Sequence, residues 1–363
     1  MFSDVFRGRR VLITGHTGFK GSWLSHWLLE LGADVAGYSL YIPSSPSNFE
    51  VLGLERRLHH YVGDIRDADA VLAAFDDFQP EIVFHLAAQA IVRTSYDDPK
   101  TTFDTNLGGT VNVLEAVRTT PTVSTAIFIT SDKCYENVEW EYGYREDDHL
   151  GGKDPYSASK ACAEIAISSY ARSFLSAQGK RIASTRAGNV IGGGDWAKDR
   201  IVPDCMRAWA AGRAPIVRSP SATRPWQHVL EPLSGYLWLA AELQSGKDGL
   251  IGEAFNFGPR AEVNQPVSRL IDEMRLTWSA PGWEADPAGV GVKAEAGLLK
   301  LCCDKALHRL GWQAVLGFGE TVSMTAAWYK TYYEGVSDMS DFTRMQLEQY
   351  TRLGRERGAP WAK

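Results

Sequence analysis

Two residues near the middle of the chain, Tyr156 and Lys160, have the types and spacing needed to move a proton. Residues four positions apart on a helix share one face, so the two side chains can act together. A tyrosine with its usual pKa of about 10 is a poor base at neutral pH, but a neighbouring ammonium group favours the phenolate. The phenolate can take a hydroxyl proton while hydride leaves the same carbon atom. The pair therefore indicates oxidation of an alcohol, although an exposed pair on a surface helix would show the same spacing.

A second acid and base, Asp132 and Lys133, follow an apolar segment, 126–130, that predicts a buried strand. In open sheets of parallel strands, ligands bind at the carboxyl ends of the strands. Adjacent opposite charges usually form a solvated turn, but their place at a strand end favours a role in chemistry. To act as a base Lys133 must be neutral, which burial and neighbouring positive charge favour.

Three glycines, Gly15, Gly18 and Gly21, lie in the segment T-G-H-T-G-F-K-G, directly after the predicted strand 11–14. A residue without a Cβ atom allows the backbone to approach a pyrophosphate closely, and a helix that starts there offers free N–H groups. A tight strand-to-helix turn alone would explain the glycines. Their position after the first strand of an alternating β/α series favours a dinucleotide site.

Strand and helix patterns alternate through the first half of the chain, which predicts an α/β fold with a Rossmann-type, doubly wound parallel sheet. Residues 1–186 are the predicted cofactor-binding domain, with segments near 225–260 returning to it, and residues 187–363 mainly form a smaller C-terminal substrate domain. The predicted strands are 11–14, 35–40, 61–62, 82–88, 126–130, 181–186 and 254–257, and the predicted helices are 22–31, 109–117 and 233–243.

Composition narrows the class of protein. The chain has 363 residues, 44% hydrophobic and 23% charged, which is ordinary for a soluble globular protein. A net charge of -6 without a dense Lys/Arg block argues against a nucleic-acid or membrane partner. No signal peptide and no apolar run of about 20 residues is visible. Five cysteines without C-x-x-C spacing indicate reduced thiols, so we expect a cytoplasmic protein. The histidines show no metal-ligand spacing, so we expect no metal.

The G-x-x-G-x-x-G spacing resembles that of the extended short-chain dehydrogenase/reductase family, and so do G-D-I-R-D at 63–67, H-L-A-A-Q at 85–89 and the segment around Asn106. The resemblance implies that Asp64 lies near the adenine amino group, that Asn106 supports the active site and that Thr130 completes the catalytic set with Tyr156 and Lys160. The cofactor-binding residues that it implies are Gly15, Thr17, Gly18, Phe19, Gly21, Asp64, Ile65, Leu86, Ala87, Ala88, Thr130, Tyr156 and Lys160.

The choice between NAD and NADP rests on the segment 37–42 after the second predicted strand. A carboxylate usually binds the adenosine ribose there, and this segment contains none. It also lacks an arginine or lysine that could bind a 2′-phosphate, so we favour NAD. Lys20, in the glycine-rich turn, is the one residue that argues the other way.

The segments T-S-D-K-C-Y-E-N, R-A-G-N-V-I-G-G-G-D-W and R-P-W-Q-H-V extend the resemblance, from Arg9 to about Trp312, to nucleotide-sugar 4,6-dehydratases. The Asp-Lys version of the acid/base pair is similar to that of members that use CDP-glucose. The resemblance implies a hydro-lyase, homodimeric and active in deoxysugar and O-antigen biosynthesis. In it, Tyr156 takes the 4-hydroxyl proton, Lys133 takes the carbon-5 proton, and Asp132 protonates the departing 6-hydroxyl group.

The substrate ligands are inferred from the same likeness. Arginine suits phosphate oxygens, so Arg224 in R-P-W-Q-H-V is expected at the diphosphate, with Arg93 as a weaker candidate. Asn189 is expected near the phosphate, and Asp195 and Trp196 in a loop beside the substrate. Ordinary alternatives are a turn cap for Asn189, a surface ion pair for Arg224 and simple packing for Trp196 or Trp226.

Two alternatives stay open. One is a dehydratase for another nucleotide, or a nucleotide-sugar epimerase, on the same scaffold. The other is a noncatalytic NAD-binding interaction module, in which replacing Tyr156 would have no effect.

Overall fold

The computed structural model describes the chain except residues 198–199, 261–262 and 287–297. Its centre is a sheet of seven parallel strands in the order β11-β6-β5-β4-β1-β2-β3. The order reverses between β1 and β4, which is where open sheets of this kind bind ligands. The strands are β1 (Arg10–Thr14), β2 (Asp34–Ser39), β3 (His59–Val62), β4 (Ile82–His85), β5 (Thr125–Ile129), β6 (Arg181–Ala187) and β11 (Ala254–Phe257).

The predicted strands are all present, and the doubly wound parallel sheet is confirmed. Several strand boundaries differ by one or two residues, and the largest difference is that β4 ends at His85 and not at residue 88. The Leu86 amide still donates to the Thr14 carbonyl, but the next residue packs against Gly15, so the chain leaves the sheet there. Continuous apolar strands such as Val11–Ile13 are fully buried, as expected for a sheet that is covered on both faces.

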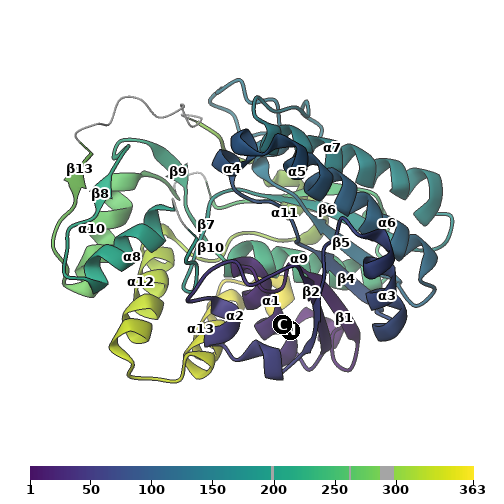
Figure 1. Ribbon diagram of the computed structural model, residues 1–363, viewed down its shortest axis with the longest axis horizontal. Helices are drawn as coiled ribbons and strands as arrows, with labels where there is room; N and C mark the ends of the chain where they lie inside the picture. The colour runs from purple at the N-terminus through teal and green to yellow at the C-terminus, as the bar shows by residue number, and fades with distance from the viewer. Residues whose placement is uncertain (198–199, 261–262, 287–297) are drawn as a thin grey trace.

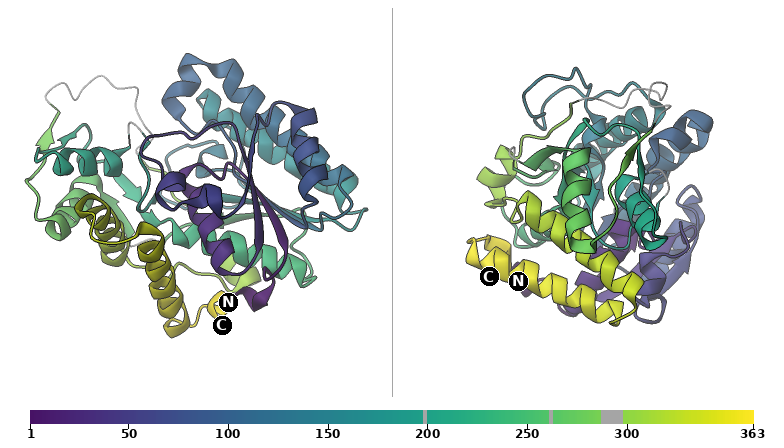
Figure 2. Two further views of the ribbon diagram at one scale, coloured as in Figure 1. Left: turned by 60° about the horizontal axis from the view of Figure 1, so that its bottom comes forward. Right: turned by 90° about the vertical axis from the view of Figure 1, so that its left-hand side faces the viewer.

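Two layers of helices cover the sheet (Figures 1 and 2). One hydrophobic cluster contains side chains of α1 (Phe19–Glu30) and α9 (Leu230–Gln244), and a second contains side chains of α3 (Ala68–Phe78), α6 (Gly109–Thr119) and α7 (Pro155–Tyr170). The remaining helices near the sheet are α2 (Asn48–Val51), α4 (Val92–Asp97), α5 (Pro99–Phe103) and α11 (Asp304–Leu310).

The other C-terminal elements form a smaller lobe beside the sheet (Figure 1). In it, β9 pairs antiparallel with β12, and α10 packs against α12. Its elements are α8 (Ile201–Ala210), β8 (Ile216–Val217), β9 (Thr223–Pro225), β12 (Asn264–Pro266), α10 (Val267–Trp278), β13 (Glu284–Ala285) and α12 (Phe318–Glu334). Two short strands, β7 (Val190–Ile191) and β10 (Gln227–His228), pair with each other, and α13 (Met339–Glu356) follows α12.

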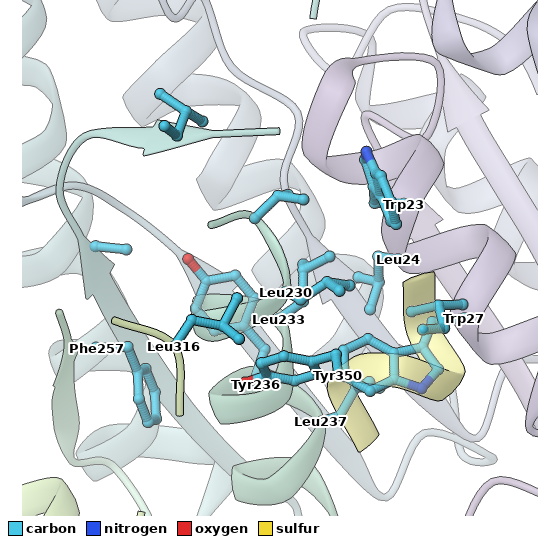
Figure 3. Close-up of a cluster of buried hydrophobic side chains, with 14 of the residues drawn as sticks. Trp23, Leu24, Trp27, Leu230, Leu233, Tyr236, Leu237, Phe257, Leu316 and Tyr350 are labelled. Atoms are coloured by element: carbon cyan, nitrogen blue, oxygen red, sulfur yellow. The ribbon is translucent and has the colours of Figure 1, made fainter. Parts of the chain in front are cut away.

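The two ends of the chain meet on the α1 side of the sheet. The rings of Phe2 and Trp361 stack with centroids 5.5 Å apart, and Trp361 also stacks on Tyr350 of α13. Figure 3 shows Trp27 and Tyr350 together with leucines of α9, so one cluster joins helices from both ends of the sequence. In the described part of the chain, no helix is long and apolar enough to span a membrane, and no group of three metal-ligating side chains comes together.

Candidate active site

The glycine-rich turn is fixed by close backbone contacts. Gly15 has a φ of +80°, and a Cβ atom on it would lie 2.7 Å from the Ala87 nitrogen. A Cβ atom on Gly21 would lie 2.1 Å from the Gly15 oxygen. Gly18 is the N-cap of α1 and provides no side-chain cap, so the first amides of α1 are not satisfied by a capping side chain. Such amides, at the positive end of a helix, suit a pyrophosphate.

The other predicted cofactor residues gather along the same edge of the sheet. The Thr17 hydroxyl donates to the Tyr41 carbonyl at 2.8 Å, and Phe19 starts α1. Asp64 follows β3, and its carboxylate accepts hydrogen bonds from the Arg66 amide and guanidinium at 2.9 Å, which lower its pKa. Further members of the set at this edge are Ile65, after β3, and Leu86, Ala87 and Ala88, after β4.

A histidine network occupies the end of β2, where a carboxylate was expected and is missing. His16 Nδ1 lies 2.9 Å from Ser39 Oγ, and His16 Nε2 lies 2.7 Å from His60 Nδ1. A Cβ atom on Gly37 would overlap the His16 ring, so only glycine leaves room for it. Burial, and then the neighbouring His60, lower the pKa of His16 to about 3. The network is therefore neutral at physiological pH.

The Tyr/Lys pair lies on the first two turns of α7. Asp154 caps the helix by accepting the Ser157 amide at 2.9 Å, and Pro155 occupies the first turn. Tyr156 and Lys160 are 8% and 5% exposed, so both are withdrawn from solvent. Burial lowers the pKa of Lys160 to about 8. Burial also raises the pKa of Tyr156, and the charge of Lys133 and a hydrogen bond with Ser131 act against this rise.

Two successive residues with hydroxyl groups, Thr130 and Ser131, follow β5. The Thr130 hydroxyl donates to the Glu164 carboxylate and also lies 3.1 Å from the Thr185 carbonyl, so it points into the protein. The Ser131 hydroxyl donates to Asp132 Oδ1 at 3.0 Å, and its interaction with Tyr156 lowers the pKa of that phenol. Thr130 therefore stays a prediction as a member of the catalytic set, and we propose Ser131 as the second candidate for that place.

Asp132 and Lys133 lie next to Tyr156. Lys133 Nζ is 3.5 Å from Asp132 Oδ1, and the two side chains are 35% and 3% exposed, respectively. A Cβ atom on Gly188 would lie 2.7 Å from Asp132 Oδ2, so this glycine makes room for the carboxylate. The charge of Lys133 also acts on Lys20, so Lys133 faces the site and does not stand isolated in solvent.

Two further cations belong to this cluster and were not assigned to catalysis or substrate binding from the sequence. Burial, and then the charge of Arg200, lower the pKa of Lys20 to about 8, and the charges of Lys160 and Lys133 add to the effect. Arg200 forms an ion pair of 2.7 Å with Asp195. Its charge also lowers the pKa of Tyr156. Its sequence neighbour Asp195 was the available signal, because a buried carboxylate needs a partner.

Some of the predicted substrate residues are already held by contacts within the protein. Asp195 is held by Arg200, and Trp196 is 4% exposed and packs edge-on against Trp328 and Tyr332. Packing thus accounts for Trp196, and it is not available to stack on a base. Trp226 is likewise buried.

Three substrate candidates stay predictions. Asn189 follows β6, and its carbonyl accepts the Gln227 amide at 3.3 Å. Arg224 lies in β9 opposite Gln265 of β12, and Arg93 lies exposed on α4.

Asn106 supports the site from behind. It is fully buried in a single turn of π-helix, 104–108, between α5 and α6. Its amide nitrogen donates to Ser159 Oγ at 2.9 Å and to the Gln89 carbonyl at 3.0 Å, while its oxygen accepts the Gln89 amide. Asn106 therefore ties the helix that carries Tyr156 to the segment that follows β4.

Comparison with known proteins decides the family. The profile of the GDP-mannose 4,6-dehydratase family matches residues 12–325. The chain belongs to this family. That result confirms the resemblance to extended short-chain dehydrogenases/reductases. The CDP-glucose 4,6-dehydratase of Salmonella typhimurium is 46% identical over 353 residues, which are 96% of this chain and 97% of the relative.

Solved structures of epimerases share the fold of this chain. A UDP-glucose 4-epimerase of Thermus thermophilus in complex with NAD is 26% identical, with a TM-score of 0.75 over 90% of this chain and 100% of that one. The epimerase Mth375 of Methanothermobacter thermautotrophicus is 22% identical, with a TM-score of 0.79 over 92% of this chain and 96% of that one, and shows the fold alone.

Proposed function

We propose that this chain converts CDP-glucose to CDP-4-keto-6-deoxyglucose and water, with NAD as a cofactor that is regenerated in each turnover. The observation that carries the proposal is the placement of an acid and a base, Asp132 and Lys133, beside Tyr156 at the carboxyl end of β5. The Salmonella relative, which matches almost the full length of the chain, is named for this reaction and supports CDP-glucose as the substrate.

The proposed NAD site is the turn formed by Gly15, Gly18 and Gly21 together with the uncapped start of α1. The close backbone packing of Gly15 and the free amides fit a pyrophosphate. NAD bound there would accept hydride from sugar carbon 4 and return it to carbon 6. The Thermus epimerase, whose structure contains NAD, supports this assignment.

Three side chains would move the protons. Tyr156 takes the proton of the 4-hydroxyl group, and the carbon becomes a ketone, which acidifies the proton on carbon 5. Lys133 removes that proton, and Asp132 gives one to the departing 6-hydroxyl group, so water leaves. Lys133 then returns its proton to carbon 5 as carbon 6 is reduced, and the proton that Tyr156 took from the 4-hydroxyl group restores the one that Asp132 gave. Ser131, whose interaction with Tyr156 lowers the pKa of that phenol, would hold the 4-oxygen in place.

The charges around Lys133 act on its role in both directions. Lys133 must be neutral when it removes the carbon-5 proton. The positive charge of Lys20 acts in that direction, whereas an ionised Asp132, 3.5 Å from Lys133 Nζ, acts against it, so Asp132 must hold its proton at this step. Arg224, Asn189 and Arg93 remain the proposed ligands of the nucleotide diphosphate, to which we add Arg200.

The test is mass spectrometry of the purified protein after separate incubations with CDP-, dTDP-, UDP- and GDP-glucose, with and without added NAD. We expect loss of one water from CDP-glucose. Loss of water from another nucleotide sugar alone would mean that the enzyme is specific for that nucleotide. A product of unchanged mass that chromatography separates from the substrate would mean that the reaction is epimerisation and not dehydration. If no nucleotide sugar changes, the proposed function is wrong.

We also infer that the chain forms a homodimer. Ile165 on α7 and Tyr96 on α4 are 60% and 44% exposed, and these two helices pack together. Apolar side chains exposed on adjacent helices suit a self-complementary interface. Light scattering should give twice the mass of the chain, and Ile165→Lys should reduce it. A single-chain mass at micromolar concentration would overturn the inference.

A further inference from the structure

Glu164, one turn beyond Lys160 on α7, is a buried acid on the helix that carries the Tyr/Lys pair. Its carboxylate is 4% exposed and accepts three side-chain hydrogen bonds. One oxygen accepts from the Thr130 hydroxyl. The other accepts from Ser184 Oγ and from Arg186 Nη2, both at 2.8 Å. Glu164 therefore joins α7 to the ends of β5 and β6 directly beneath the catalytic segment.

Arg186 is itself fixed, so the carboxylate has no freedom to turn away. Its Nη1 donates to the Tyr135 hydroxyl at 2.8 Å and to the Glu146 carbonyl at 2.9 Å. Its guanidinium carbon also lies 4.8 Å from the centre of the Tyr135 ring. Although burial raises it, the charge of Arg186 and the hydrogen bonds lower the pKa of Glu164 overall. The acid is therefore ionised at neutral pH.

A buried ion pair is weak evidence of stabilisation, because apolar residues of the same size often do as well. The position of Glu164 near Lys160 offers another explanation for a buried ion pair at this place. Glu164 is the foremost group that opposes the effect of burial on the pKa of Lys160. The groups that act on Lys160 are Glu164 of α7 and Cys134 after β5, and Lys160 in turn acts on Lys20 of α1 and on His85 of β4. Asp132 and Lys133 act on Lys20, and Arg186 of β6 acts on Glu164.

We propose that Glu164, held by Arg186, is a positioning residue that keeps Lys160 charged and anchors Thr130, and with it the Ser131–Asp132 segment, to the helix that carries Tyr156. Without this anion, Lys160 would lose its proton in the buried site and could no longer favour the phenolate. The consequence for catalysis rests on the proposed function, but the charge state of Lys160 does not depend on it.

The direct test measures Lys160 in the protein without substrate. Only the neutral amine reacts with acetic anhydride, so acetylation of the Lys160 peptide as a function of pH, read by mass spectrometry, gives the midpoint of its titration. In Glu164→Gln we expect the midpoint to fall by about one pH unit or more, as expected for loss of an adjacent opposite charge. Ser184→Ala is the matched control, because it removes a hydrogen bond from the same carboxylate without changing its charge. Its midpoint should stay near that of the parent protein.

Glu164→Gln leaves Arg186 buried without its partner, so the variant can fail to fold. The double variant Glu164→Gln/Arg186→Met removes both charges, and the lowered midpoint should persist in it. An unchanged midpoint in the folded double variant overturns the proposal.

The pH profile of activity supplies the catalytic readout. The charged form of Lys160 is fully present below its pKa and is lost as pH rises through it, so activity should fall on the alkaline side. In Glu164→Gln that alkaline fall should begin at lower pH, by the same shift as the acetylation midpoint, whereas Ser184→Ala should keep the parent profile. If the parent protein dehydrates no sugar, the proposed function fails while the acetylation result still decides the role of Glu164. A shifted midpoint with an unshifted profile overturns the catalytic part alone.

Discussion

The glycine-rich turn after β1 and the catalytic segment after β5 lie at the same edge of the sheet, yet they are built differently. The turn is shaped by backbone contacts, in which Gly15 packs on the chain after β4 and Gly21 packs on Gly15. The catalytic segment is shaped by side chains, in which Thr130 donates to Glu164, and Ser131 donates to Asp132 and lowers the pKa of Tyr156. The turn therefore has no room for a Cβ atom at Gly15 or Gly21, whereas the geometry of the catalytic segment depends on the side chains that lie beneath it.

This difference explains why the turn can be predicted from the sequence more completely than the catalytic segment. A missing Cβ atom is written directly in the sequence, so the turn could be located from three letters and their spacing. The direction of a hydroxyl group depends on partners such as Glu164 and Thr185, which lie far along the chain. Variants of the turn should consequently lose stability and NAD affinity, whereas variants of the catalytic segment should lose rate.

The largest effect is expected from Lys133→Met. Its side chain is about a third exposed, so the fold should persist. Removal of a general base typically costs a factor of about 10²–10⁴ in rate. Water loss, followed by mass spectrometry, should therefore nearly stop, while the first oxidation continues and reduced cofactor accumulates in the absorbance spectrum. Normal dehydration by this variant would falsify the role of Lys133 as the base.

Gly15→Ala should damage the turn rather than the chemistry. An alanine at a φ of +80° is strained by about 1–3 kcal/mol, and its Cβ atom would also meet the Ala87 backbone at 2.7 Å. We expect a lower melting temperature and at least about tenfold weaker NAD binding by calorimetry, equivalent to 1.4 kcal/mol. Gly53→Ala is the matched control, because Gly53 has a φ of +59° but no atom near its missing Cβ. Equal losses of NAD affinity in the two variants would remove the close contact as the cause.

The same contrast between local sequence signals and distant partners determines which features could be predicted from the sequence. Central strands such as β1 and β5 were predicted because their apolar runs report burial on both faces, and the largest error was the end of β4, which was placed three residues too late. Thr130 was preferred to Ser131 because the sequence does not say which of two successive hydroxyl groups faces Tyr156. Trp196 was open between stacking and packing because its neighbours, Trp328 and Tyr332, belong to a helix near the other end of the chain.

A comparison of Ser131→Ala with Thr130→Val decides which of the two hydroxyl groups belongs to the catalytic set. A hydrogen bond to a charged group contributes about 1.5–3 kcal/mol, so loss of the Ser131 hydroxyl should lower kcat by about tenfold to a hundredfold. The melting temperature of Ser131→Ala should change little. Thr130→Val leaves one oxygen of the buried Glu164 without its donor and should mainly lower stability, by about 1–3 kcal/mol. If Thr130→Val loses the greater part of kcat and Ser131→Ala keeps it, the original assignment was right.

Glu231, on α9, offers the smallest and most selective test, because it is a buried acid that serves the fold and lies outside the catalytic segment. Its oxygens accept the Val315 amide at 2.9 Å and the Tyr350 hydroxyl at 2.9 Å, which ties α9 to α13. Burial raises its pKa from the usual value to about 7. A raised pKa means that the folded state binds the proton more tightly, so its contribution is full below pH about 4.5 and is lost as pH rises towards 7.

The loss over that range amounts to at most about 3 kcal/mol. Because buried histidines also make stability depend on pH, the difference between the parent protein and Glu231→Gln isolates this acid. Urea unfolding at pH 5 and pH 7.5 should show Glu231→Gln gaining stability relative to the parent as pH rises, with kcat unchanged at either pH. If the two proteins differ by the same free energy of unfolding at both pH values, Glu231 keeps one charge state between pH 5 and pH 7.5, and its burial does not make the stability depend on pH.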